Sequence, residues 1–169
     1  AYTRVVTERG TPEFWDLKGK DDPDGAETLK NLIEPYFKVT PESIQGTVFV
    51  NTNTMFLDRT AGPNLSTLQS LSSFNVVDGM ALGFIVEDKD CKAVFGESTA
   101  LKNVCATMIV DVNGSTRPNM FGFDIFKFYI TKFGLQPYGT QEDETYPFDT
   151  ACNNGGTGYG CTAWVILRR

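Results

Sequence analysis

The chain has 169 residues, with 15 lysines and arginines against 21 aspartates and glutamates, and it contains no histidine. Its length suits one domain spanning residues 1–169, and its 41% apolar and 21% charged residues are typical of a globular protein. The absence of histidine excludes catalytic units and metal sites that depend on imidazole, and the net charge of −6 argues against a nucleic-acid partner.

The start of the chain predicts two short helices separated by a polar loop. Apolar residues within 2–9 recur with helical spacing, and the Gly-Thr-Pro sequence at 10–12 ends the pattern. We expect these residues to be the last turns of a helix whose start lies upstream. Residues 16–25 are polar and rich in turn-forming types, and 26–37 carry an amphipathic helical pattern that Pro35 ends or kinks.

The pattern then changes to that of β-strands. Residues 47–51 and 55–57 are β-branched and apolar, and the Asn-Thr-Asn-Thr sequence between them predicts a turn. Glycine, proline and serine in 60–75 predict a loop. The ranges 80–86 and 104–112 are the strongest strand predictions because both are nearly continuous apolar runs.

The last third of the chain predicts two further strands. An Asp-Gly turn at 78–79 precedes the run at 80–86. The aromatic range 124–133 fits a strand or a short helix buried against the sheet, of which we favour the strand, and the apolar range 161–167 predicts a closing strand. Strands therefore dominate the last 120 or so residues and helices are confined to the start, an arrangement typical of the α+β class.

The four cysteines, Cys91, Cys105, Cys152 and Cys161, indicate an oxidising compartment. Their number is even and no pair forms a CxxC motif, which favours two disulfides and an exported protein over a zinc or redox site. Among the three possible pairings we favour Cys91–Cys105 with Cys152–Cys161, because each closes a short loop. Four buried thiols in a cytosolic protein are the alternative. No apolar run is long enough to span a membrane and no signal peptide opens the chain.

Residues 111–124 form a candidate calcium site. Asp111, Asn113, Asn119 and Asp124 lie in a stretch rich in glycine and proline directly after a predicted strand, and hard cations such as calcium prefer oxygen ligands of these types. The spacing does not match an EF-hand. The alternative is a loop of Asx-turns in which the same side chains bind local backbone amides.

Several segments resemble bacterial type IV pilin-like proteins, which include the pseudopilin subunits of type II secretion. The segment 110–128 resembles their DVNG…PN..G.D.F.F signature, and the Cys-Thr-Ala-Trp-Val-Ile ending at 161–166 resembles their final strand. The strand after Asp-Gly at 78–79 is similar to one of theirs, and residues 10–15 and 35–39 fit the segment that follows their first helix.

This resemblance implies a pilin-like α+β fold, in which the C-terminal part of an N-terminal helix and a loop pack on an antiparallel sheet. It implies a non-enzymatic subunit that assembles with copies of itself and other pilin-like subunits through an apolar helix half upstream of this chain. That helix would anchor the subunit in the inner membrane before assembly into a surface filament or a periplasmic pseudopilus. The family often staples a C-terminal loop with one disulfide, a part that Cys152–Cys161 could play.

Two other functions remain open at this stage. The loop at 111–124 and the many aromatic residues also fit a secreted calcium-dependent binding or adhesion module. The excess of acidic residues leaves room for a carboxylate-based hydrolase, although no two carboxylates stand at a recognisable catalytic spacing. Calcium is the one cofactor that the sequence suggests.

Overall fold

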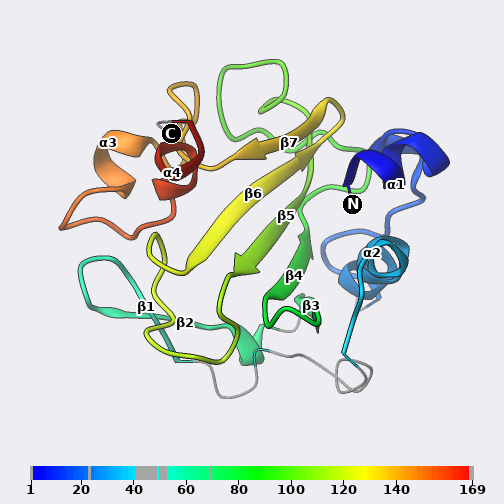
Figure 1. The fold of residues 1–169 in the computed structure, drawn as a ribbon. Helices are drawn as coiled ribbons and strands as arrows, with labels where there is room; N and C mark the ends of the chain where they lie inside the picture. Colours follow the sequence, from blue (N-terminus) through cyan, green and yellow to red (C-terminus); the bar gives the residue numbers. More distant parts are fainter. Residues whose placement is uncertain (1, 23, 41–48, 50–52, 69, 168–169) are drawn as a thin grey trace.

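A computed structural model describes residues 2–22, 24–40, 49, 53–68 and 70–167 and has an α+β architecture around a five-stranded antiparallel sheet (Figure 1). Each strand pairs with the next one along the chain, so the order across the sheet is β3-β4-β5-β6-β7. The bounds are Ser72–Asn75 for β3, Ala81–Val86 for β4, Val104–Asp111 for β5, Ile125–Thr131 for β6 and Gly134–Pro137 for β7.

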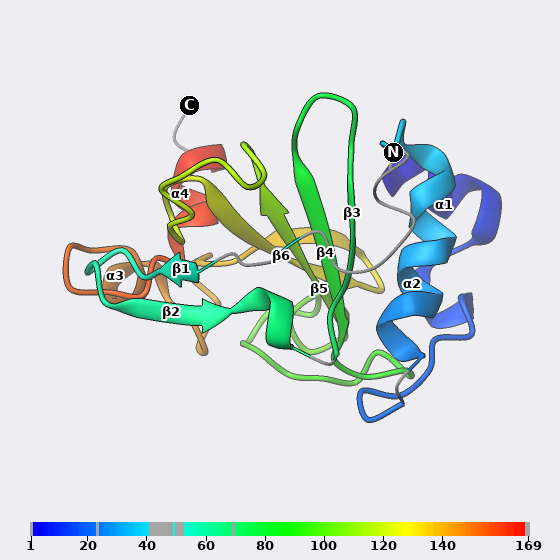
Figure 2. The ribbon, with the colours of Figure 1, turned by 90° about the horizontal axis from the view of Figure 1, so that it is seen from below.

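Helices lie at two ends of this sheet, and a small hairpin lies beside it (Figures 1 and 2). Helix α2 contacts β3 and β4, and α1 lies beside α2 with its Tyr2 hydroxyl donating to the Thr131 carbonyl of β6; at the other end α4 contacts β6 and β7, with α3 beside α4. None of the described helices is both long and apolar enough to cross a membrane. The bounds are Tyr2–Arg9 for α1, Gly25–Ile33 for α2, Phe148–Ala151 for α3, Cys161–Leu167 for α4, Asn53–Met55 for β1 and Ala61–Asn64 for β2.

The main core lies between the N-terminal helices and one face of the sheet. Side chains alternate between the two faces along a strand, so Leu82, Phe84 and Val86 of β4 point the same way. They pack with Val5 of α1 and Leu29 of α2, both fully buried. These contacts hold the two short helices on the sheet, because helices of this length have little stability of their own in water.

Most of the strongest predictions are confirmed. The range 2–9 is helix α1, and 26–37 contains α2 followed by a 3₁₀ turn at Pro35. The strands predicted at 80–86, 104–112 and 124–133 are β4, β5 and β6, shortened by one or more residues at their ends. Nearly continuous apolar runs therefore identified β4 and β5, and the aromatic run identified β6.

The prediction of a closing strand at 161–167 is wrong, and so is the implied likeness to a final pilin strand. These residues form helix α4, which leaves Trp164, Ile166 and Leu167 exposed and buries only its first turn. A run of seven apolar residues does not by itself distinguish helix from strand. The expectation that helices are confined to the start of the chain is wrong for the same reason.

The loop predicted at 60–75 is also wrong, because this range contains β2 and β3. Both are edge strands, where proline and serine are tolerated: Pro63 lies in β2, and Ser73 of β3 is buried. Residues 51–54 are predicted to form a turn, but Asn53 and Thr54 belong to strand β1. The strand predicted at 47–51 lies outside the described residues except for Phe49, which is buried.

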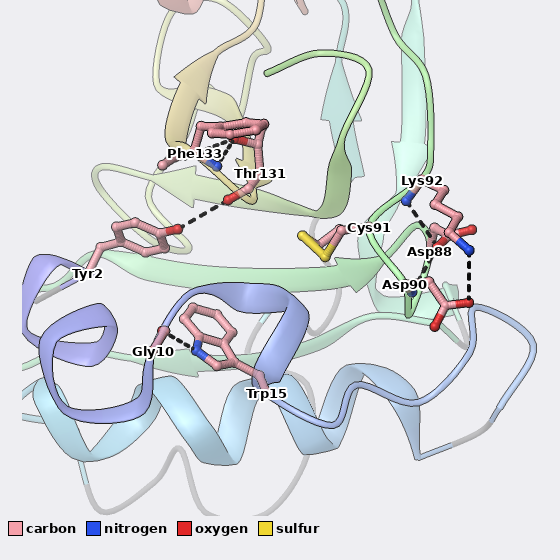
Figure 3. The surroundings of a disulfide bond; sticks show 11 residues. Tyr2, Gly10, Trp15, Asp88, Asp90, Cys91, Lys92, Thr131 and Phe133 are labelled. Atoms are coloured by element: carbon pink, nitrogen blue, oxygen red, sulfur yellow. Dashed lines mark hydrogen bonds and ion pairs between the residues drawn. A yellow bond between two sulfur atoms is a disulfide. The ribbon is translucent and has the colours of Figure 1, made fainter. Parts of the chain in front are cut away.

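The favoured disulfide pairing is confirmed, with Cys91 joined to Cys105 and Cys152 joined to Cys161. Cys91 lies in the turn after β4, which the Asp88 carboxylate holds by accepting from two backbone amides, and the disulfide ties this turn to β5 (Figure 3). Trp15 also lies near this disulfide (Figure 3). Two disulfides are typical of a protein that folds in an oxidising, exported environment.

A glycine in the second disulfide loop gives the first prediction. Gly158 has φ +84°, and a Cβ atom there would overlap the carbonyl oxygen of Phe121. We expect Gly158→Ala to lower the free energy of unfolding by about 3 kcal/mol, measured by urea denaturation. Gly155→Ala is the matched control, because its Cβ would meet only the Asn153 side chain at 3.6 Å. Equal stability of the two variants would contradict this account.

Candidate functional site

The candidate calcium loop connects β5 to β6, and the small hairpin supports it from outside the sheet. The Met55 amide of β1 donates to the Asn119 carbonyl at 2.9 Å, and the Phe121 amide donates to the Met55 carbonyl at 2.9 Å. Asp111 ends β5 opposite Ile125, the first residue of β6. The sheet register therefore brings the two ends of the loop together, and β1 holds its middle.

Asp124 organises this loop through its carboxylate. Its Oδ2 accepts from the Asn119 amide at 2.9 Å and from the Asn113 side-chain Nδ2 at 3.2 Å. Its Oδ1 accepts from the Met120 amide. With three donors on a buried carboxylate, Asp124 serves to close the loop, and its oxygens are already engaged.

Asp111 lies beside Asp124 and is differently placed. Its side chain is 0% exposed, and its Oδ1 accepts from the Asn113 amide at 3.2 Å, as in an Asx-turn. Its Oδ2 is buried and has no hydrogen-bond partner among the described residues, and the same is true of the Asn113 Oδ1. Burial, with a smaller contribution from the Asp124 charge, raises the pKa of Asp111 to about 7.

The Asn119 side chain reaches into the same loop. It is 7% exposed, and one terminal atom of its amide lies 3.1 Å from the carbonyl oxygens of both Gly114 and Thr116. An amide nitrogen at this place donates two hydrogen bonds, whereas an oxygen there brings three oxygens together. The nitrogen therefore belongs at this place, where Asn119 donates to the carbonyls of Gly114 and Thr116.

The structure therefore gathers all four predicted residues, Asp111, Asn113, Asn119 and Asp124, in one loop. Within the described part of the chain no three acidic, cysteine or histidine side chains gather at a possible metal site. Any cation in this loop must be held by one carboxylate with amide and carbonyl oxygens. The Asx-turn interpretation also has support, since Asp111 accepts from the backbone two residues on.

The pKa of Asp111 gives a prediction about pH. In the folded state its pKa is about 7, above the ordinary value of 3.8. Between about pH 4 and about pH 7 the folded protein therefore keeps a proton on Asp111 that the unfolded chain has lost. This group therefore lowers stability as pH rises from about 4 to about 7. With EGTA present, we expect Asp111→Asn to be more stable than the wild type by about 1–3 kcal/mol at pH 8. Urea denaturation at pH 5 and pH 8 measures it, and an equal difference at both pH values would contradict it.

The neighbouring carboxylates Asp111 and Asp124 are the pair that a hydrolase hypothesis would use. Their side chains are 0% and 3% exposed, so neither presents an oxygen to a substrate at the surface. Three donors further occupy Asp124. This pair gives no support to a carboxylate-based hydrolase.

Sequence reasoning did not identify a lysine that lies among tyrosine rings. The Lys127 ammonium lies 4.0 Å from the ring centre of Tyr159, 5.2 Å from that of Tyr138 and 5.7 Å from that of Tyr146. Burial lowers the pKa of Lys127 to about 8, although the charge of Glu87 acts against this shift. The tyrosines are far apart in sequence and follow no period, so no pattern in the chain could have found this cluster.

An apolar groove lies between β5, β6 and helix α4. Val112, Phe123 and Ile166 are 45%, 66% and 48% exposed there, which is unusual for large apolar side chains that lie close together. We call this surface the α4 groove. It is lined by Val110, Val112, Phe123, Phe126, Phe128, Thr162, Val165 and Ile166.

Comparisons of the chain with protein-family models, with curated proteins and with solved structures find no match. The resemblance to pilin-like proteins therefore rests on the residues of the chain itself.

Proposed function

We propose that this chain is the head domain of a filament subunit of the type IV pilin or type II secretion pseudopilin kind. One observation carries the proposal: an N-terminal helix, with Val5 fully buried, packs with α2 on one face of an antiparallel sheet. This is the arrangement that the resemblance implies. In the proposed subunit α1 continues upstream into an apolar segment, which bundles with those of other subunits.

The α4 groove supports an assembly role. Val110 belongs to it and also packs against the main core under α1 and α2, so the groove continues the face of the sheet that carries these helices. No lining residue of the groove is charged. A subunit surrounded by neighbours buries such a surface, whereas a freely soluble monomer leaves it in contact with water.

The disulfides support the proposed location. Cys91, Cys105 and Cys161 are almost completely buried, and every cysteine is paired. Such bonds form in the periplasm or outside the cell, where pili and pseudopili assemble. In the proposal the subunit is held in the inner membrane by its upstream helix until it enters the filament.

The α4 groove provides the test. We expect Ile166→Lys to reduce incorporation into filaments roughly tenfold, because a lysine in an apolar contact must be desolvated. The variant should fold normally, since Ile166 is half exposed and lies in the last turn of a helix, where a positive charge is tolerated. Incorporation is measured by quantitative mass spectrometry of the isolated filaments.

Val94→Lys is the matched control, because Val94 is 61% exposed and lies outside the α4 groove. Both variants should melt within a few degrees of the wild type, which is the expected range for surface substitutions. Normal incorporation of Ile166→Lys would exclude the α4 groove as a subunit contact. Equal loss in both variants would exclude a specific role for it.

A further inference from the structure

A surface pocket lies where helices α3 and α4 meet the loop that follows β7, and α3 lies beside α4 at this end of the sheet (Figure 1). Its volume of about 560 Å³ is within the usual range of ligand sites. We call this surface the Trp164 pocket. Its main lining residues are Glu142, Phe148, Asp149, Ala163, Trp164 and Leu167. It is separate from the α4 groove, because the two surfaces use different residues of α4.

The walls of the Trp164 pocket are held by bonds within the chain. The second disulfide joins the end of α3 to the first residue of α4. The Ala163 amide donates to the Tyr138 carbonyl at 2.9 Å, which fixes α4 beside the end of β7. The Gly139 amide donates to the Asp143 carboxylate at 3.0 Å, which fixes the loop that forms the third wall. The pocket is therefore preformed, and a ligand need not order it on binding.

The charged side chains of the Trp164 pocket are all acidic. Glu142 and Asp149 line it, whereas no lysine or arginine does so among the described residues. Neither carboxylate forms an ion pair with a described residue, and the remaining polar lining, Thr140 and Gln141, is neutral. Trp164 is 47% exposed, which is unusual for the largest aromatic side chain. The pocket therefore presents two uncompensated negative charges beside an accessible indole ring.

These two features together select a cationic ligand. The face of a tryptophan ring attracts cations more strongly than the face of any other side chain, and the two carboxylates attract the same charge. A guanidinium group is planar and weakly hydrated, so it stacks on an aromatic ring while it donates to a carboxylate. A lysine ammonium is compact and strongly hydrated, and it gains less from such a surface. The lining of the pocket therefore fits arginine best.

We propose that the Trp164 pocket binds an arginine side chain of a partner protein, with the guanidinium stacked on Trp164 and paired with the carboxylates of Glu142 and Asp149. The contact of a single exposed side chain is weak, so a short peptide should bind with a dissociation constant on the order of 1 mM. The inference does not depend on filament assembly, because none of these three residues lines the α4 groove.

The test is an NMR titration of the purified, isotope-labelled chain with the peptide acetyl-Gly-Arg-Gly-amide. The indole N–H signal of Trp164 should shift, whereas that of Trp15 should not, because Trp15 is buried and its indole donates to the Gly10 carbonyl at 2.7 Å. The same peptide with citrulline, which keeps the shape of arginine without its charge, should bind at least about fivefold more weakly. The peptide with lysine should bind at least about twofold more weakly than the arginine peptide.

Variants of the lining residues test the individual contacts. Trp164→Ala, followed through the backbone amide signals of α4, should weaken binding at least about fivefold, and so should the double variant Glu142→Gln with Asp149→Asn. All three side chains are exposed, so these variants should fold normally. Phe133→Ala is the matched control, because Phe133 is an aromatic residue that is 62% exposed and lies outside the pocket. It should bind the arginine peptide as the wild type does.

A Trp164 signal that does not respond to the arginine peptide at about 10 mM would overturn the proposal. Equal affinity for the citrulline or lysine peptide would also overturn it, as would unchanged affinity in Trp164→Ala. Arg168 and Arg169 follow α4 in the sequence, and their double substitution by glutamine should leave the affinity unchanged. Binding seen only in that variant would contradict a partner's arginine and favour the chain's own. Each of these failures would leave the proposed filament function untouched, because incorporation into filaments is measured separately.

Discussion

Replacing Asp143 by alanine should cost more stability than any other single substitution considered for this protein, about 3–5 kcal/mol. Asp143 is 1% exposed, and its carboxylate accepts from the Tyr129 hydroxyl at 3.1 and 3.3 Å. It also accepts from three backbone amides at 2.8–3.1 Å, those of Gly139, Thr145 and Tyr146. Alanine would leave four donors without this acceptor, and two of them, on Tyr129 and Gly139, belong to buried residues.

The effect should extend to the aromatic core beside β6. Tyr129 stacks on Tyr138 with ring centres 3.7 Å apart, and Tyr138 stacks on Tyr146 at 5.3 Å. Burial raises the pKa of Tyr129 far above its usual range, so its hydroxyl remains a donor at every pH at which the protein folds. Loss of Asp143 therefore releases both the loop after β7 and the ring that anchors it.

Urea denaturation followed by circular dichroism measures this loss. Glu142→Ala is the control, because Glu142 is the exposed neighbour of Asp143, and it should change stability by no more than about 0.5 kcal/mol. Asp143→Asn should fall between the two, since one amide oxygen can still accept from some of the donors. If Asp143→Ala were as stable as Glu142→Ala, the carboxylate would not be the centre of this loop.

Removing the Cys91–Cys105 disulfide should have the second-largest effect. Its loop has a sequence separation of 14, which corresponds to about 3 kcal/mol of chain entropy. Both cysteines are 0% exposed and belong to the main core, so the double substitution to alanine also removes buried sulfur contacts. We expect a total loss of about 3–5 kcal/mol.

The Cys152–Cys161 disulfide is the matched comparison. Its separation of 9 gives a similar entropy, but the chain around it belongs to a surface loop and Cys152 is half buried. Its double substitution to alanine should cost about 2–3 kcal/mol. Urea denaturation of both variants and of the reduced wild type measures the difference. A greater loss from the Cys152–Cys161 variant would contradict the placement of Cys91 and Cys105 in the core.

Strands β4 and β5 could be predicted from sequence because strands buried on both faces require nearly continuous apolar runs, as in 104–112, and β6 could be predicted from its aromatic residues. The edge strand β3 could not, since Ser72 and Ser73 resemble a loop. Ser72 is half-buried where its hydroxyl donates to Glu27 of α2, and Ser73 is buried beside β4. Helix α4 was missed because its conformation is fixed from outside the segment: the Tyr138 carbonyl accepts from the Ala163 amide, and Thr162 Oγ1 accepts from the Lys127 amide.

The residues of the candidate calcium loop were identified from their types, but their roles depend on contacts that the sequence does not contain. Asp111 and Asp124 are both aspartates in the same stretch, and nothing in their spacing distinguishes them. The pairing of β5 with β6 buries both, and only Asp124 faces the amides of Asn119 and Met120. The contribution of Met55 was also hidden: its range 55–57 was predicted as a strand, but no pattern in the chain connects it with Asn119 and Phe121 more than sixty residues later.

The location of this chain in cells that produce it tests the proposed function most directly. Filaments are isolated from the cell surface or the periplasm, and the chain is quantified there and in the dispersed protein fraction by mass spectrometry. The account predicts that the chain is enriched in the filaments as a repeated subunit, and that Ile166→Lys shifts it to the dispersed fraction. A wild-type chain found entirely as dispersed monomer, with filaments that lack it, would contradict the account.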